Sequence, residues 1–300
     1  MSEALVMTLP PAAAPPAAPP RRALSPRLLP LGLGLPVVGW QIVFFAAPLA
    51  FLLVVTFWKV ENYRLAPAFS LANWERVLTS TPFQRALVHT FTVAGTTTAL
   101  ALVLAFPAAY VIALRLSPRA RDLAVAALIV PVFSSYILRV YAWQVLLSPE
   151  GAINAALTAL GLPPQAMLGN AFALQVGLLT LTLPIAVLIF VFALSAVDRT
   201  LIEAAANLGC SPARTIRAVL IPAVRPAILL AATTTFLLAF GDYASPVFLG
   251  GGRPPTLSIL IVDTVKSGSQ WPRASVIGVA MLVILGLVFV LGQLLARGRR

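Results

Sequence analysis

Long runs of apolar residues alternate with short polar segments along most of the chain. A helix needs about 20 predominantly apolar residues to cross the hydrocarbon core of a bilayer. Six runs reach this length, so the pattern predicts an all-α membrane protein with six transmembrane helices in one domain, residues 31–300. The predicted spans are residues 36–58, 87–114, 123–147, 171–197, 227–249 and 274–296.

Proline residues interrupt five of these runs. A proline leaves a helix carbonyl without its usual N–H partner, but the neighbouring helices of a bundle can satisfy that carbonyl. We therefore interpret each run as one span. The prolines concerned are Pro48, Pro107, Pro131, Pro184 and Pro246.

The composition is that of a membrane protein, with 60% hydrophobic and only 10% charged residues, whereas a soluble domain carries about 25% charged residues. We therefore expect the net charge of +12 to reflect orientation in a bilayer and not a nucleic-acid partner. The single cysteine, Cys210, excludes an internal disulfide. With only one histidine, His89, the usual Cys/His metal clusters are excluded too, and we expect no metal or cofactor.

Residues 1–30 are rich in alanine and proline, which cannot build a packed core, so they are predicted to form a disordered cytoplasmic tail. The apolar run from Leu28 to Trp58 is too long for the core of a signal peptide and lacks a convincing cleavage site. We therefore interpret it as an uncleaved first span.

The positions of arginine and lysine predict the orientation, because cytoplasmic segments carry an excess of these residues. With a cytoplasmic N-terminus, 13 basic residues fall on the inner face and 7 on the outer face, and Arg139 lies within a span. The bias places both termini and the polar segment 198–226 in the cytoplasm.

The polar segment 198–226 has the local chemistry of a helical hairpin. The stretch from Leu201 to Leu208 favours a helix, and Gly209 supplies the left-handed residue that ends such a helix. Ser211 is placed to cap a second helix, with Pro212 at its first position, where the missing N–H costs nothing. We predict two short helices joined by a tight turn, which form a compact knob at the membrane surface.

This segment also resembles the EAA loop of the permease subunits of ATP-binding-cassette (ABC) importers. That loop reads Glu-Ala-Ala, three residues, Gly, nine residues and Ile-x-Leu-Pro, and here only Val for Ile and Ile for Leu depart from it. The resemblance implies that the segment docks into a cleft of a separate ATPase subunit. The alternative is a solvated charged loop that only joins two spans. The residues that carry the resemblance are Glu203, Ala204, Ala205, Gly209, Val219, Ile221 and Pro222.

No catalytic motif is recognisable in the chain. Lys266 precedes Ser267, but Val265 and Leu260 occupy the positions where a phosphate-binding loop requires glycine. No Ser/His/Asp set, HExxH motif or pair of carboxylates stands out either. We therefore expect that the chain is not an enzyme and that any ATP is hydrolysed on a separate subunit.

Two charged residues fall inside predicted spans, where a charge is costly unless it faces protein or water. If both spans are straight, Arg139 and Asp242 lie at a similar depth, roughly 22–24 Å from the cytoplasmic side. They either form an ion pair that locks two helices, or line a polar cavity in which Asp242 binds a cationic substrate. In the second case, four residues would supply aromatic faces for the cation. These are Tyr136, Tyr141, Trp143 and Tyr243.

Two further stretches resemble the B-type permease subunit of spermidine/putrescine importers. They are ILRVYAWQVLLSPEGAINAALTALGL around Arg139 and FGDYASPVFLGG around Asp242. The resemblance implies the type I importer (MetI-like) fold and transport of a polyamine. Related subfamilies move opines, thiamine, ferric iron or other small solutes, and these alternatives stay open.

The resemblance also implies a set of partners in a bacterial inner membrane. They are a second, homologous permease, two P-loop ATPase subunits and an extracytoplasmic solute-binding protein. The competing class is a secondary transporter that works alone, but the chain lacks the inverted repeat and the several intramembrane carboxylates expected for ion coupling.

Overall fold

The structure, a computed structural model, describes residues 28–297. The chain divides after Phe51 into two compact units, which are described separately. The predicted cytoplasmic tail lies outside the described residues, except that residues 28–30 already belong to the first helix.

The first unit is an almost continuous apolar helix, interrupted by one π-helical turn. In this turn the Ala47 N–H bonds to the Ile42 carbonyl, one residue further back than in an α-helix. The wide turn directly precedes Pro48, which has no N–H to donate. Residues Leu35–Val55 are long and apolar enough to span a membrane, as predicted for the first span. The elements are α1 (Leu28–Gln41), η1 (Ile42–Ala46) and α2 (Ala47–Val55).

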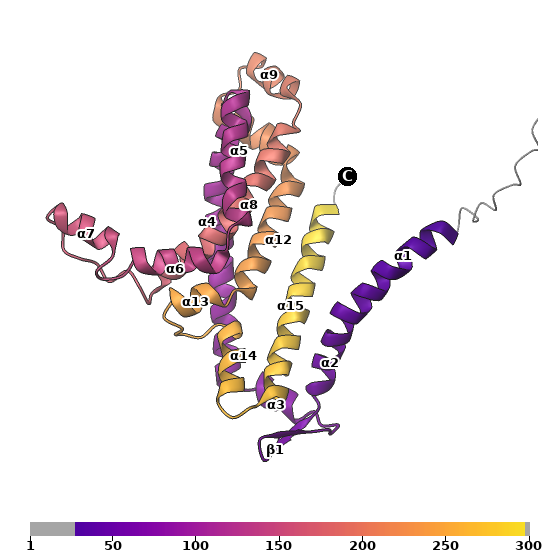
Figure 1. The fold of residues 1–300 in the computed structure, drawn as a ribbon. Helices are drawn as coiled ribbons and strands as arrows, with labels where there is room; N and C mark the ends of the chain where they lie inside the picture. The colour runs from indigo at the N-terminus through magenta and orange to yellow at the C-terminus, as the bar shows by residue number, and fades with distance from the viewer. Residues whose placement is uncertain (1–27, 298–300) are drawn as a thin grey trace, which may run out of the picture. The chain divides into compact units, whose positions relative to one another are not determined.

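The second unit is a helical bundle built around α4 (Figure 1). Helix α4 contacts α8 and α12, α8 also contacts α5, and α12 also contacts α15. Along α4, Ala101, Ala105, Ala109 and Ala113 are buried at intervals of four residues. Such a stripe of small residues lets membrane helices approach closely, where van der Waals contacts hold them together. The five helices are α4 (Thr81–Leu114), α5 (Pro118–Phe133), α8 (Ala171–Ser195), α12 (Arg225–Gly241) and α15 (Trp271–Arg297).

Short elements connect these helices. Strands β1 (Lys59–Glu61) and β2 (Arg64–Ala66) form an antiparallel hairpin in which Val60 pairs with Leu65. The short helices are α3 (Ala72–Leu78), α6 (Tyr136–Leu146), α7 (Ala152–Ala159), α9 (Arg199–Asn207), α10 (Pro212–Thr215), η2 (Ile216–Leu220), α11 (Ile221–Ala223), α13 (Ala244–Phe248) and α14 (Leu257–Lys266).

The second, fourth and sixth predicted spans are single helices, whereas the predicted span 123–147 consists of two helices that meet at a sharp break. Helix α5 ends at Phe133, and α6 leaves it at an angle of 95°. The backbone is extended at Ser134, and the Ser135 side chain accepts a hydrogen bond from the Leu138 N–H, which starts α6. Pro131 removes one donor just before the break, and two successive serines offer the backbone alternative hydrogen bonds.

The predicted fifth span, 227–249, is also broken. Helix α12 ends at Gly241, Asp242 is extended with φ −70° and ψ 138°, and α13 forms a separate short helix. At its other end, the segment Pro212–Ala223 meets α12 at 74°. The similar depth inferred for Arg139 and Asp242 assumed two straight helices, so that inference no longer holds.

The bundle has two chemically different ends. The α9–α10 hairpin lies at the end where α4 and α8 finish and α12 begins (Figure 1). The β-hairpin and α3 lie at the opposite end, where both contact α15. Near the C-terminus of α15, Gly292 packs against Thr233 of α12, and Ala296 lies in one pocket with Pro226 at the start of α12, so α15 and α12 run antiparallel (Figure 1).

Candidate functional site

The polar segment 198–226 folds as the predicted hairpin, and its local hydrogen bonds explain why. The Asp198 carboxylate accepts a hydrogen bond of 2.9 Å from the Thr200 N–H at the start of α9. The same bond holds the pKa of Asp198 below its usual value, because it stabilises the charged form. The Ser211 side chain accepts a hydrogen bond of 3.4 Å from the Arg214 N–H, and Pro212 is the first residue of α10.

The turn between the two helices depends on Gly209. Its φ of +77° lies in the left-handed region, which residues with a side chain rarely adopt. The Cys210 N–H bonds to the Ala205 carbonyl at 3.0 Å, and the Gly209 N–H bonds to the Ala206 carbonyl at 2.9 Å. This pair of bonds is the Schellman ending of a helix, which satisfies two carbonyls that would otherwise have no partner.

The residues predicted for coupling divide between an outer and an inner face of the hairpin. Of the seven predicted residues, Ala205 is buried, Val219 is half-buried and the five others are exposed. Sequence reasoning missed Leu208, whose side chain is 84% exposed at the tip of the hairpin. Its position directly before the turn glycine is the signal that could have identified it. The five exposed residues are Glu203, Ala204, Gly209, Ile221 and Pro222.

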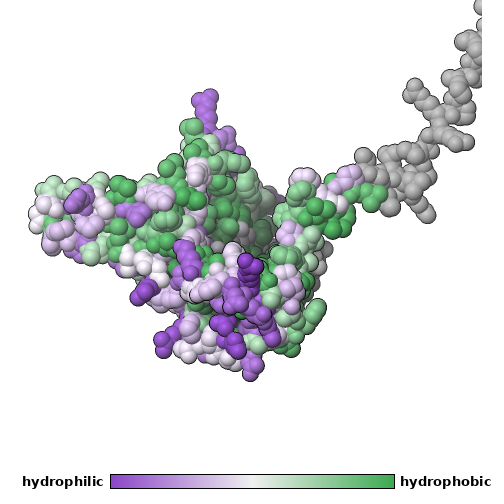
Figure 2. All heavy atoms as spheres, turned by 60° about the horizontal axis from the view of Figure 1, so that its bottom comes forward, coloured by the Kyte–Doolittle hydropathy of each residue, from purple (hydrophilic) through white to green (hydrophobic). Residues whose placement is uncertain are grey.

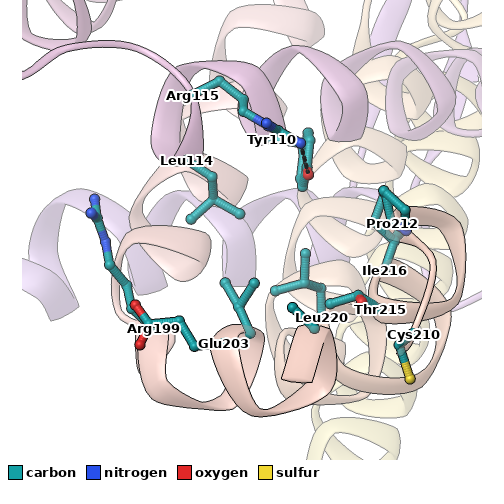
Figure 3. A pocket seen from close by; sticks show the side chains of 12 residues that line it. Tyr110, Leu114, Arg115, Arg199, Glu203, Cys210, Pro212, Thr215, Ile216 and Leu220 are labelled. Carbon is teal, nitrogen blue, oxygen red and sulfur yellow. Dashed lines mark hydrogen bonds between the residues drawn. The ribbon is translucent and has the colours of Figure 1, made fainter. Parts of the chain in front are cut away.

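A pocket of about 330 Å³ lies between the hairpin and the end of α4 (Figure 3). On one wall, Arg115 donates a hydrogen bond of 3.3 Å to the Tyr110 hydroxyl. On the other wall lie Glu203 and Cys210. The exposed Glu203 carboxylate makes no hydrogen bond or ion pair with any other described residue, so it is free to meet another protein.

A second polar site lies where α6, α8 and α13 meet, and it contains three of the six residues predicted for the substrate pathway. The Asp242 carboxylate is 9% exposed and accepts hydrogen bonds from the Tyr136 hydroxyl at 2.8 Å and the Ser245 N–H at 2.9 Å. It also accepts one of 3.2 Å from the Ala244 N–H. Tyr136 further bonds to the Ser245 hydroxyl. Asp242 therefore both caps α13 and ties it to α6.

Arg139 does not pair with Asp242, so the ion pair considered as one alternative is not formed. Instead its Nη1 donates a hydrogen bond of 2.7 Å to the Thr180 carbonyl in α8. Pro184 follows Thr180 by four residues and has no N–H, so this carbonyl lacks its partner within the helix. The guanidinium also lies over the Tyr136 ring, 5.8 Å from its centroid. Pro184 is the signal in the sequence that could have identified the Thr180 carbonyl as lacking a partner, but the sequence analysis did not connect it with Arg139.

The other three predicted residues lie around this junction. Tyr141 packs against Phe248 of α13, with ring centroids 4.8 Å apart. Trp143 lines a pocket of about 360 Å³ together with Arg139. Tyr243 follows Asp242 in the chain and is 38% exposed. The structure therefore joins Tyr136, Arg139 and Asp242 at one junction, while the other aromatic side chains pack beside it.

The contact between Arg139 and Thr180 leads to a prediction that involves two substitutions. Arg139→Met leaves the Thr180 carbonyl without a donor, which costs about 1–3 kcal/mol. Pro184→Ala restores an N–H that can bond to this carbonyl. We therefore expect Arg139→Met to lower the thermal unfolding temperature in detergent. The decrease should be much smaller when the same substitution is made in a chain that already carries Pro184→Ala. Equal losses in both backgrounds would show that Arg139 stabilises the chain by other means.

The close approach of α8 and α13 leads to a further prediction. A Cβ atom at Gly177 would meet Leu249 Cδ1 at 2.5 Å and Ser245 Oγ at 2.6 Å, whereas one at Gly95 meets nothing within 4 Å. Gly177→Ala is therefore expected to destabilise the chain by about 1–3 kcal/mol through overpacking. Gly95→Ala is expected to be stabilising by about 0.5–1 kcal/mol, because alanine is the better helix former. Thermal unfolding should give shifts of opposite sign, and a loss at Gly95 as large as that at Gly177 would contradict the packing argument.

Apolar helices long enough to cross a membrane, with a capped polar hairpin at one end of the bundle, are the features of a multi-pass integral membrane protein. The family described as "Binding-protein-dependent transport system inner membrane component" matches residues 105–300, and the chain belongs to this family. It is an ABC importer permease subunit of the inner membrane and not an enzyme. The competing interpretation, a secondary transporter that works alone, receives no support from this family.

Two relatives from Escherichia coli (strain K12) match most of the chain. The spermidine/putrescine transport system permease protein PotB is 27% identical over 255 residues, which cover 84% of this chain and 92% of the relative. The inner membrane ABC transporter permease protein YdcU is 28% identical over 280 residues, which cover 85% of this chain and 88% of the relative.

Solved structures share the fold at low sequence identity. A chain of a bacterial ABC transporter that imports the acidic polysaccharide alginate has a TM-score of 0.71 at 17% identity, with 90% of this chain and 95% of that chain covered. A chain of the MetNI methionine ABC transporter has a TM-score of 0.56 at 18% identity, with 74% and 100% covered. The type I importer fold is therefore confirmed. The alginate transporter has also been solved in complex with an alginate pentasaccharide-bound periplasmic protein.

Proposed function

We propose that this permease subunit carries a polyamine, spermidine or putrescine, across the inner membrane. The observation that carries the proposal is the Asp242 carboxylate, held by Tyr136 and Ser245 where one broken helix meets another. A carboxylate away from bulk water attracts an ammonium group strongly. The likeness to a spermidine/putrescine permease over most of both chains supports the same solute class.

The position of Arg139 bears on the choice of solute. Because its guanidinium is bonded to the Thr180 carbonyl and not to Asp242, it does not neutralise that carboxylate directly. The negative charge therefore remains for a cationic solute. Thiamine and ferric iron are also cationic and fit the same charge, so these solutes and the opines are the alternatives to test.

The hairpin of α9 and α10 is proposed to dock into a separate ATPase subunit on the cytoplasmic side. Its exposed Glu203 and Leu208 offer a charged and an apolar contact, and its capped helices make it a rigid lever. ATP binding would close two ATPase subunits and move the hairpin, which would open the bundle to the outside, and hydrolysis would reset it. Both chain termini would then be cytoplasmic.

The complete transporter is proposed to contain a second, homologous permease, two P-loop ATPase subunits and an extracytoplasmic solute-binding protein. The solute would leave its binding protein at the outer face and pass along the Asp242 junction between the two permeases. The proposal follows from the family, whose members are components of binding-protein-dependent systems.

Reconstitution of the complete transporter in liposomes tests the proposed solute. We expect ATP-dependent uptake of labelled spermidine or putrescine in the presence of the cognate binding protein, and no competition from excess thiamine, opine or ferric citrate. Binding of one of these other solutes by the cognate binding protein, without binding of polyamines, would contradict the proposal while leaving the role as a permease intact.

A further inference from the structure

A pocket of about 370 Å³ lies at the end of the bundle opposite the α9–α10 hairpin. It is formed by two pairs of consecutive elements that lie far apart in the sequence: α3 with the start of α4, and the end of α14 with the start of α15. Two arginines line it, Arg76 from α3 and Arg273 from α15. None of its residues belongs to the hairpin or to the Asp242 junction.

The two arginines have no anionic partner among the described residues. The Nε atom of Arg273 is buried and makes no hydrogen bond. Glu75 and Asp263 lie on the elements that form the pocket, but both are exposed and neither forms an ion pair with either arginine. Arg76 is exposed and Arg273 is half-buried, but a buried Nε donor without an acceptor is costly, so an anion bound here would stabilise the site.

The remaining polar groups of the pocket do not replace that anion. The hydroxyls of Ser80 and Thr264 already donate hydrogen bonds to the carbonyls of Val77 and Leu260. The 27-residue helix α15 begins at the pocket, and the N-terminus of a helix attracts negative charge. In the first turn of α15, the Trp271 and Ala274 N–H groups already bond to the Ser269 and Gln270 carbonyls, and Pro272 has no N–H. The helix start therefore contributes mainly its partial positive charge, and the two guanidinium groups are the donors that suit a phosphate.

The pocket lies where apolar helices end. Helices α4 and α15 are both long and apolar enough to span a membrane, and they begin at Thr81 and Trp271, beside the pocket. The Trp271 side chain is 52% exposed, and tryptophan is typical of the boundary between membrane and water. Figure 2 shows hydrophilic side chains gathered on this end of the molecule, next to apolar surfaces. The inner wall of the pocket is apolar, since it includes Phe83 and Ile277.

We propose that this pocket binds the phosphodiester head group of an anionic phospholipid, such as phosphatidylglycerol. Arg76 and Arg273 bind the phosphate, and the apolar wall accommodates the glycerol and the start of the acyl chains. A carboxylate of a docked protein would use the arginines but would have no need of an apolar wall. The site stabilises the end of the bundle that faces away from the hairpin.

Lipid titration of the full-length chain in nanodiscs tests the proposal. Phosphatidylglycerol is added to a phosphatidylcholine background, and bound lipid is counted by native mass spectrometry. We expect Arg76→Gln/Arg273→Gln to need about tenfold or more phosphatidylglycerol for the same occupancy, because each arginine contributes to anionic lipid binding. The matched control is Arg64→Gln in the β-hairpin, which removes a charge at the same end but outside the pocket. Arg273→Lys should keep most of the binding.

Three results would overturn the assignment. One is equal lipid occupancy in the double variant and in the Arg64→Gln control. Another is equally tight binding of inorganic phosphate, which would make the pocket a site for free anions. The third is loss of docking of the solute-binding protein with lipid occupancy unchanged, which would assign the arginines to a protein partner. Because a fold defect could mimic the expected loss, the thermal unfolding temperature without added lipid must match that of the control.

Discussion

Replacement of Gly209 by valine is expected to abolish ATP-driven uptake while the chain still inserts into the membrane. Gly209 has φ of +77°, and a β-branched residue there carries a strain of about 1–2 kcal/mol or more. A strain of about that size shifts an equilibrium roughly 5- to 30-fold. Because the strain acts on the turn between α9 and α10, the hairpin loses its rigid shape and no longer transmits movement. The measurement is ATP-dependent uptake by the reconstituted transporter, normalised to the amount of permease.

The matched control is Gly209→Asn, because asparagine tolerates the left-handed conformation better than other residues with a side chain. A Cβ atom at this position meets nothing within 4 Å in the chain itself. We therefore expect Gly209→Asn to keep most of the uptake. Loss in both variants would indicate that an ATPase subunit occupies the space beside Gly209, whereas full uptake with valine would exclude the hairpin as a lever.

Asp242→Asn is expected to reduce polyamine uptake about tenfold or more. Asparagine caps a helix about as well as aspartate, so the variant keeps the cap of α13 and removes only the charge. The lost attraction between a poorly hydrated carboxylate and an ammonium group is several times stronger than it would be in water. Initial uptake rates at saturating binding protein measure the effect on the permease itself.

Two further variants separate charge from capping at this position. Asp242→Ala removes both, and Tyr136→Phe removes the hydroxyl that bonds to the Asp242 carboxylate and to Ser245 but leaves the carboxylate charged. We expect near-normal polyamine uptake in Tyr136→Phe and a severe loss in Asp242→Ala. If Asp242→Asn transports as well as the native chain and only Asp242→Ala fails, the residue serves as a cap and not as a solute ligand.

The sequence predicts the hairpin in detail because each interaction that determines its conformation joins residues close together in the chain. The Asp198 and Ser211 caps, Pro212 and the left-handed Gly209 all act within a few residues of their positions. The apolar runs likewise predict the membrane helices, since the length of a run is sufficient to identify a span.

The two helix breaks could not be predicted in the same way. Prolines occur both in α4, which stays continuous through Pro107, and just before the break after α5. At both breaks the contacts that hold the broken helices in place are tertiary: the Tyr136 hydroxyl of α6 donates to the Asp242 carboxylate, and Arg139 satisfies the Thr180 carbonyl of α8. Such partners lie 41 to 106 residues apart in the chain, beyond any local pattern.

The location of Cys210 gives the most direct measurement of the central claim, that the hairpin faces the cytoplasm and meets an ATPase there. It is the only cysteine of the chain, lines the hairpin pocket and is half-buried. A membrane-impermeant maleimide should label it in inside-out vesicles and not in right-side-out vesicles, and a bound ATPase subunit should protect it. Arg64→Cys in a Cys210→Ser background, at the opposite end, should show the reverse sidedness. Labelling of Cys210 from the outside would contradict the account.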